Sequence, residues 1–329
     1  MLDRRDFLSQ TGLGVLAAGM AAPWTAFAPH STAEGDNVTD DDQQAIIDTH
    51  QHLWDLSKFK LPWVNDPGLE LMKRNYLMAD YLKATTGFNI AKTVYMEVDV
   101  DPSQQQKEAD YILKLCEQEG NPLDGAVISG RPAEKGFGPY INALAKKPLV
   151  KGVRQVLQNP TTERGYCLQP QFVEHIQLLG KLGLSFDLCM RPAEVIDTVE
   201  LVDRCPKTQF ILDHCGNMEV ANADKDVRKS WEQAIRDLAD RPHVACKISG
   251  IVVTANKDWK PADLADVVNF CLDAFGEDRV VFGGDWPVCT LRATLPQWIN
   301  ALREIVKDRP QDFRRKLWHD NAVKVYRLT

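Results

Sequence analysis

The sequence predicts an α/β fold, a single but distorted (β/α)8 barrel of the TIM type. Eight short runs rich in apolar and β-branched residues recur along the chain, and amphipathic stretches of helical period separate most of them. No glycine-rich phosphate loop follows any of these runs, which disfavours a doubly wound open sheet. Ionisable residues stand at the ends of several runs, where the strands of such a barrel carry the active site.

The predicted strands cover residues 45–50, 91–99, 123–130, 149–157, 184–190, 209–216, 244–250 and 279–286. Helical patterns fill residues 104–119, 138–146, 170–182, 192–205, 230–239 and 261–275, and residues 295–306 and 312–326 supply closing helices. Residues 54–76 show no strand alternation and predict a long loop after the first strand, over the mouth of the barrel. We therefore assign residues 45–329 to the barrel domain.

Composition and charge narrow the possible partners. The chain has 329 residues, is 44% hydrophobic and carries a formal net charge of −7, which suits an ordinary globular enzyme. This acidic balance argues against nucleic acid as a partner and favours a small-molecule substrate. Eight cysteines are scattered without a Cys-x-x-Cys pair, and Cys189, Cys215, Cys246 and Cys271 lie in or beside apolar runs. Buried thiols are favoured over a metal or disulfide framework.

The first 28 residues have the pattern of a twin-arginine export signal. Arg4 and Arg5 precede an uncharged stretch from residue 7 to 30, and the Ala-Phe-Ala run at 26–28 offers a cleavage site. The stretch is short and broken by glycines, so no stable membrane span is expected once the signal is cut, although an uncleaved anchor is the alternative. Residues 29–44 are predicted to form a flexible leader. These features predict a periplasmic or otherwise exported protein.

Three of the seven histidines fall at predicted strand ends. His50 and His52 close the first strand one residue apart, and side chains at i and i+2 of a strand share a face. An isolated His-x-His is a weak signal, but His214 ends the sixth predicted strand and Asp285 the eighth. Three imidazoles and one carboxylate make a plausible shell for one divalent metal, such as Zn²⁺, with an open position for water.

Asp285 is the predicted general base. A carboxylate that is free of the metal or weakly bound to it can accept a proton from water and return it to the leaving oxygen. The alternative is that Asp285 only caps the Gly-Asp-Trp-Pro turn in which it lies. The agreement of the other strand-end residues favours catalysis.

Two cations inside predicted strands are candidates for substrate contact. Arg154 and Lys247 have apolar neighbours, where a bare charge is costly unless it is paired or faces a polar cavity. The alternative for each is a buried ion pair with Glu97 or Asp187. Trp54 and Trp286 are also assigned to substrate binding, and the alternative for the tryptophans of the long loop is that they pack the loop down.

Six ordered motifs carry a resemblance to a known family. They are DTHQHLWD at 48–55, KGVR at 151–154, FDL at 186–188, LDHCG at 212–216, CKISG at 246–250 and FGGDWPV at 282–288. Closing runs at 321–322 and 326–328 match as well. Over residues 45–329 the chain resembles the amidohydrolase superfamily, in its type-2 branch of metal-dependent sugar lactonases such as L-fuconolactonase and L-rhamnonolactonase.

The resemblance implies hydrolysis of small lactones or related esters. It carries His50, His52, His214 and Asp285 over to the metal and base positions, with Glu97 as a further ligand of a mononuclear centre. Members with two metals differ, because this chain has Arg154 where they use a carbamylated lysine and has no histidine on the fifth strand. Some relatives work with one metal or none, so a single Zn²⁺ is an expectation.

We therefore expect a hydrolase that opens a sugar-acid lactone, with Asp285 and His214 as catalytic residues and the metal or the histidines stabilising the oxyanion. One alternative is a metal-dependent decarboxylase of the same superfamily, which uses a similar rim on a carboxylated ring. Another is a non-catalytic periplasmic binding protein, because a fold does not determine a function.

Overall fold

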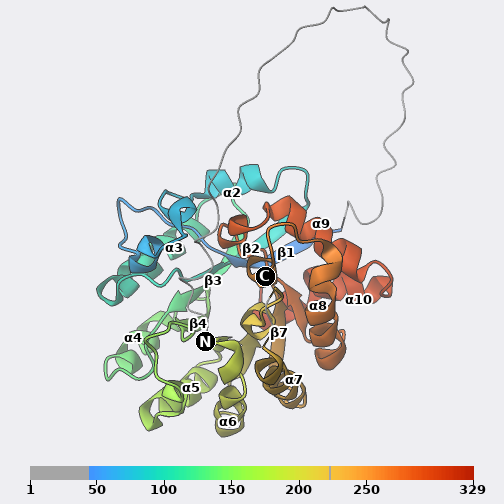
Figure 1. The fold of residues 1–329 in the computed structure, drawn as a ribbon. Coiled ribbons are helices and arrows are strands. Elements are labelled where there is room, and N and C mark those ends of the chain that lie inside the picture. Colours follow the sequence, from blue (N-terminus) through green and yellow to red (C-terminus); the bar gives the residue numbers. More distant parts are fainter. Residues whose placement is uncertain (1–43, 222–223) are drawn as a thin grey trace, which may run out of the picture.

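The computed structural model describes residues 44–221 and 224–329, which form an eight-stranded parallel barrel (Figure 1). Each strand pairs in parallel with the next one along the chain. The strands are β1 (Ile46–Gln51), β2 (Ile90–Met96), β3 (Leu123–Ser129), β4 (Val150–Val156), β5 (Ser185–Cys189), β6 (Gln209–Leu212), β7 (Val244–Ile248) and β8 (Val280–Phe282). The predicted (β/α)8 barrel is confirmed.

Two strands end earlier than the sequence predicted. We expected residues 209–216 and 279–286 to be extended, but β6 stops at Leu212 and β8 at Phe282. The reason is that His214 and Asp285, just beyond these ends, take positive φ angles of 55° and 51°. A left-handed backbone cannot continue a strand, so both residues sit on turns at the barrel mouth.

The barrel is distorted where β8 meets β1. Gln51 and Trp286 form an isolated parallel bridge there, next to a hydrogen bond from the His52 backbone N–H to the Trp286 carbonyl at 2.8 Å. The Thr49 hydroxyl donates to the Phe282 carbonyl at 2.6 Å. The Asp48 carboxylate adds a further link by accepting the Gly284 backbone N–H at 2.7 Å. This seam carries the His-x-His end of β1 and the turn that contains Asp285.

Helices surround the barrel on the outside (Figure 1). They are α2 (Met78–Ala84), α3 (Gln105–Cys116), α4 (Phe137–Leu144), α5 (Pro170–Lys181), α6 (Asp197–Arg204), α7 (Lys225–Ala239), α8 (Pro261–Phe275), α9 (Leu295–Val306), α10 (Gln311–Arg315) and α11 (Asn321–Tyr326). The expected closing helix at 312–326 is broken into α10, a π-helical turn at Lys316–Asp320 and α11. The long loop after β1 holds two 3-10 turns, Pro62–Asn65 and Glu70–Met72.

Two apolar cores hold the fold together. The larger one lies between the strands and the surrounding helices. The smaller one fills the barrel with inward side chains of the strands and closes it with α11 and Leu328; its members are Ile47, Val94, Met96, Val127, Ile211, Ala245, Val281, Ala322, Val325, Tyr326 and Leu328. The charged residues of the site therefore stand above an apolar floor.

The predicted signal, and the predicted leader up to residue 43, lie outside the described residues. Among the residues that the structure describes, none of the helices has the length and apolar character needed to cross a membrane. All eight cysteines are free thiols, and all except the half-buried Cys116 are buried. The preference for buried thiols over disulfides is confirmed.

Candidate active site

The two histidines of β1 lie close together at its carboxyl end. The ring centroids of His50 and His52 are 4.8 Å apart, and both side chains are buried. The Nδ1 atom of His52 lies 2.9 Å from the Met96 carbonyl oxygen. Because a carbonyl can only accept, Nδ1 carries a proton, and Nε2 is the nitrogen that faces Asp285.

His214 reaches the same place from a strained turn. Three consecutive residues, His214, Cys215 and Gly216, are left-handed, a conformation that costs roughly 1–2 kcal/mol for each residue that is not glycine. The Trp231 indole N–H holds the turn by donating to the Cys215 carbonyl at 2.8 Å. A Cβ atom on Gly250 would lie only 2.3 Å from His214 Nδ1, so glycine is required there. The centroid of the His214 ring lies 4.4 Å from that of the His50 ring.

Asp285 completes the group that we call the catalytic cluster, which consists of His50, His52, His214 and Asp285. Asp285 Oδ1 lies 3.4 Å from His52 Nε2 and 3.7 Å from His50 Nε2. Ligand atoms of His50, His214 and Asp285 all lie within 4.8 Å of one another. The structure thus brings together four of the five residues predicted to bind metal.

The donor set of the cluster fits a divalent cation such as Zn²⁺. His214 Nδ1 lies 2.8 Å from the Ser249 hydroxyl, so His214, like His52, engages one ring nitrogen with a neighbour and leaves the other for the cluster. Histidine ligands of metals are commonly oriented by such a second hydrogen bond. Imidazole nitrogens and one carboxylate oxygen are the ligands of many mononuclear zinc sites.

Glu97, the fifth predicted ligand, lies in an ion pair instead. Its Oε1 accepts from Arg154 Nε at 2.7 Å, and its Oε2 accepts the Asp99 backbone N–H at 2.8 Å. Arg154 also donates to the Glu97 carbonyl at 2.7 Å and contacts His50 Nε2 at 3.3 Å and Asp213 at 3.4 Å. The structure therefore pairs Glu97 with Arg154, and Glu97 is outside the groups of described residues that could hold a metal.

Lys247 is fully buried, and its ammonium group lies between two carboxylates and the ring of His50. Its Nζ lies 2.8 Å from Asp187 Oδ2, 2.9 Å from Asp213 Oδ1 and 3.2 Å from His50 Nδ1. The Tyr326 hydroxyl donates to the same Asp187 oxygen at 2.6 Å. For both Lys247 and Arg154 this arrangement matches the ion-pair alternative drawn from the sequence, and their contact with substrate stays a prediction.

Burial and the two cations set the charges of the site. Burial, aided by Lys247, lowers the pKa of His50 well below its usual range, and burial also lowers the pKa of His214. Burial would raise the pKa of Asp213, but Lys247 and the histidines outweigh it and hold that pKa well below the usual range. For Asp187, burial outweighs Lys247 and raises the pKa to about 6. The lowered pKa values favour the neutral forms of His50 and His214, and neutral imidazole is the form that binds metal ions.

The two tryptophans assigned to substrate binding lie in an aromatic group under the long loop. Trp54 is 1% exposed, and its indole N–H donates to the Arg74 carbonyl at 2.7 Å. Trp286 is 3% exposed and packs edge to face against Tyr76 and Tyr81. The contacts of Trp54 match the packing alternative that the sequence left open for the loop, and substrate contact by Trp54 or by Trp286 stays a prediction.

Sequence reasoning left three residues of the site without a role. Asp213 was visible beside His214, but only the fold shows that it lies between Arg154 and Lys247. Ser249 orients His214 from the end of β7, two residues after Lys247, and a strand-end hydroxyl could have been noted. Tyr326 lies in a closing run that matches the family, but only the fold shows that it reaches Asp187 from α11 at the far end of the chain.

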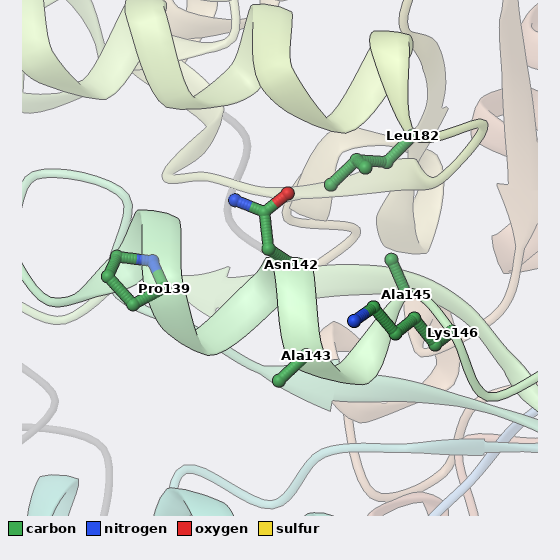
Figure 2. Close-up of a pocket in the computed structure, with 6 residues that line it drawn as sticks. All are labelled: Pro139, Asn142, Ala143, Ala145, Lys146 and Leu182. Carbon is green, nitrogen blue, oxygen red and sulfur yellow. The ribbon is translucent and has the colours of Figure 1, made fainter.

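A separate hollow lies on the outside of the barrel (Figure 2). It is formed by α4, the residues that follow α4 and the residue that follows α5, and its lining consists of Pro139, Asn142, Ala143, Ala145, Lys146 and Leu182. Lys146 is the ionisable residue of this lining, and no carboxylate or imidazole faces it there. The hollow therefore offers none of the acid–base chemistry found in the catalytic cluster.

A parallel barrel with histidines and an aspartate at its carboxyl end has the arrangement of an enzyme that acts on small molecules by acid–base or metal-assisted chemistry. The model of the amidohydrolase family known as Amidohydro_2 matches residues 47–328 of this chain. The chain therefore belongs to this amidohydrolase family. The family predicted from the six motifs is confirmed.

Two relatives and one solved structure are similar to this chain along most of its length. It is 29% identical over 299 residues to the uncharacterized protein y4mH of Sinorhizobium fredii, covering 86% of this chain and 99% of that protein. It is 27% identical over 292 residues to an L-fucono-1,5-lactonase of Burkholderia multivorans, covering 86% and 96%. The crystal structure of a Burkholderia multivorans amidohydrolase with bound zinc shares the fold, with a TM-score of 0.77 at 24% identity over 87% of this chain and 100% of that one.

Proposed function

We propose that this protein is a lactonase that opens the ring of a sugar-acid lactone by adding water to its carbonyl carbon. The observation that carries the proposal is the position of Asp285, a carboxylate at the barrel mouth beside the imidazoles of His50 and His52. Similarity to an L-fucono-1,5-lactonase along nearly the full length of both chains supports a lactone as substrate.

The chemistry requires one base that becomes an acid. Asp285 takes a proton from the attacking water, and the oxygen of that water forms a bond to the lactone carbonyl carbon. The ring C–O bond then breaks, and the proton held by Asp285 passes to the departing ring oxygen, which becomes the hydroxyl of the product acid. His214 lies beside this carboxylate within the cluster, and the hydrogen bond with the Ser249 hydroxyl orients its ring.

The negative charge that builds on the carbonyl oxygen needs a positive environment. Arg154 supplies one. Burial alone would lower the pKa of its guanidinium group, but the ion pair with Glu97 outweighs burial and raises that pKa. The guanidinium group therefore stays charged, and its Nη1 lies 3.3 Å from His50 Nε2. His50, His52, His214 and Asp285 would hold a divalent ion such as Zn²⁺, which polarises a carbonyl and lowers the pKa of bound water when present.

The test follows acid release from a panel of aldono-1,4- and aldono-1,5-lactones. We expect turnover by the parent protein and a loss of about 10³-fold in kcat/KM for Asp285→Asn, in the range typical of a removed general base. Asp124→Asn is the matched control, since Asp124 pairs with Lys92 on β2 outside the cluster and its loss should leave kcat/KM unchanged.

Other outcomes would contradict the proposal in distinct ways. Carbon dioxide release from carboxylated rings, with no acid from any lactone, would identify a decarboxylase. Equal lactone turnover by the parent and by Asp285→Asn would remove Asp285 from the mechanism. Binding of lactones without turnover by the folded parent protein would indicate a binding protein.

We also propose that the protein is exported through the twin-arginine pathway. The support is the Arg4-Arg5 pair ahead of an uncharged stretch and an Ala-Phe-Ala run. Cell fractionation should find the mature chain in the periplasm, and the double variant Arg4→Lys, Arg5→Lys should keep the uncut chain inside the cytoplasm. Unchanged export of that variant would rule this route out.

A further inference from the structure

Three cysteines from distant parts of the chain meet behind His214. Cys215 lies in the left-handed turn after β6, Cys246 on β7 and Cys271 on α8. Their sulfur atoms all lie within 4.8 Å of one another, and each side chain is fully buried. We call this group the thiol triad.

The spacing of the triad suits an ion held by three sulfurs. With zinc–sulfur bonds of about 2.3 Å, three sulfurs arranged in a trigonal plane stand about 4 Å apart. Separations of up to 4.8 Å therefore need only a small inward shift of the side chains. Thiolates are soft ligands and select soft or borderline cations with a filled d shell, such as Cu⁺, Zn²⁺ and Cd²⁺.

We propose that the thiol triad is a binding site for one thiophilic metal cation, separate from the catalytic cluster. As the ion binds, each S–H bond is replaced by a bond from sulfur to the metal, and three protons leave to solvent for three thiolates formed. The proposal concerns binding and stands whether or not the protein is a lactonase.

The triad is joined to the catalytic cluster through the backbone. Cys215 directly follows His214, and its thiol lies 3.9 Å from the carbonyl oxygen of Lys247. The Cys215 carbonyl in turn accepts the Trp231 hydrogen bond that holds the left-handed turn. An ion that draws the Cys215 sulfur inward therefore pulls on the turn that aims the His214 ring. Occupancy of the triad should change the activity of the enzyme through His214.

The burial of the triad determines how the ion must be supplied. None of the three side chains is accessible in the folded protein, so the cation enters while the chain folds or during local opening. The full-length chain is therefore produced in cells grown with added Cd²⁺, purified, and compared with protein that received Cd²⁺ after purification. Cadmium is the probe because its bonds to thiolate absorb in the near ultraviolet.

The expected result is one Cd²⁺ per chain with a thiolate-to-cadmium absorption band and three sulfur neighbours by X-ray absorption spectroscopy. The Cys271→Ser variant should lose the band. Cys167→Ser, which alters a buried cysteine in the turn Tyr166–Leu168 outside the triad, should keep it.

Two results would overturn the proposal. One is a cadmium shell of nitrogen and oxygen only, which would place the ion in the catalytic cluster. The other is the absence of a thiolate band from parent protein prepared by either route. Because the sulfur count is measured on the parent protein, the test does not depend on whether the serine variants fold.

Discussion

Two layers of side chains inside the barrel come from the same strands and have opposite chemistry. Val127, Ile211, Ala245 and Val281 point inward and form the apolar floor together with α11. Side chains two residues apart on a strand share a face, so Lys247 stands one layer above Ala245 on β7, where it pairs with Asp213. The lower layer stabilises the fold by removing apolar surface from water, whereas the upper layer holds buried charges beside the histidines and Asp285. One strand of five residues can therefore serve both purposes.

Asp213, in the upper layer, differs from Glu108, a buried acid elsewhere in the protein. Asp213 faces Lys247, Arg154 and His50, and its pKa lies well below the usual range. Glu108 on α3 accepts hydrogen bonds from the Tyr95 hydroxyl and the Val98 backbone, and burial together with the Glu97 charge raises its pKa to about 8. Both carboxyls are buried, so the difference lies in their partners.

Removal of the central cation should have the largest effect on stability. Lys247→Met leaves Asp187 and Asp213 buried without their shared partner, and we expect the free energy of unfolding to fall by about 3–5 kcal/mol. Lys92→Met is the matched control, because the Lys92 pair with Asp124 is partly exposed and should contribute less than about 1 kcal/mol. Denaturant unfolding of both variants measures the contrast, and equal losses would show that burial of the pair is unimportant.

A change in the apolar floor should separate stability from catalysis. Val127→Ala removes buried methyl groups below the charged layer, and we expect a loss of about 1–3 kcal/mol in the free energy of unfolding. The charged side chains keep their contacts, so kcat/KM for the best lactone should stay within about twofold of the parent value. A large fall in kcat/KM with little change in stability would mean that the two layers are not independent.

The stability of the protein should depend on pH through Glu108, a buried carboxyl group that lacks the cations found around Asp213. Glu108 has a pKa of about 8 in the folded chain against an ordinary value of 4.5, so between these values the folded state holds a proton that the unfolded state has lost. Its contribution to stability is therefore complete below pH 4.5 and is lost as the pH rises toward 8.

Glu108→Gln is neutral in both states and should be free of this loss. The difference in unfolding free energy between Glu108→Gln and the parent should grow in favour of the variant by about 1.4 kcal/mol per pH unit across the window. Glu119→Gln, at an exposed position beyond the end of α3, is the control and should run parallel to the parent at every pH. Denaturant titrations at pH 5, 6 and 7 measure this difference. If the stability of Glu108→Gln ran parallel to that of the parent, the raised pKa of Glu108 would be contradicted.

The sequence by itself determined the features that depend on near neighbours. The alternation of apolar runs and helical patterns predicted the barrel, and the spacing of His50 and His52 placed both imidazoles together. His214 and Asp285 were found because each follows an apolar run that had to be a strand. In these cases a few adjacent residues carry the signal, since the period of a strand is a local property. The ends of β6 and β8 were predicted too late, because the left-handed turns that stop them left no such pattern.

Only the tertiary structure decided which charged groups became partners. Lys247 meets His50 across 197 residues, and Tyr326 meets Asp187 across 139. The sequence offered Glu97 and Asp187 as partners for either cation, and the order of the strands around the barrel brought Arg154 to Glu97 and Lys247 to Asp187. The thiol triad arose in the same way from the turn after β6, from β7 and from α8. Such contacts depend on where whole elements pack, and nothing in the residues next to each partner encodes that position.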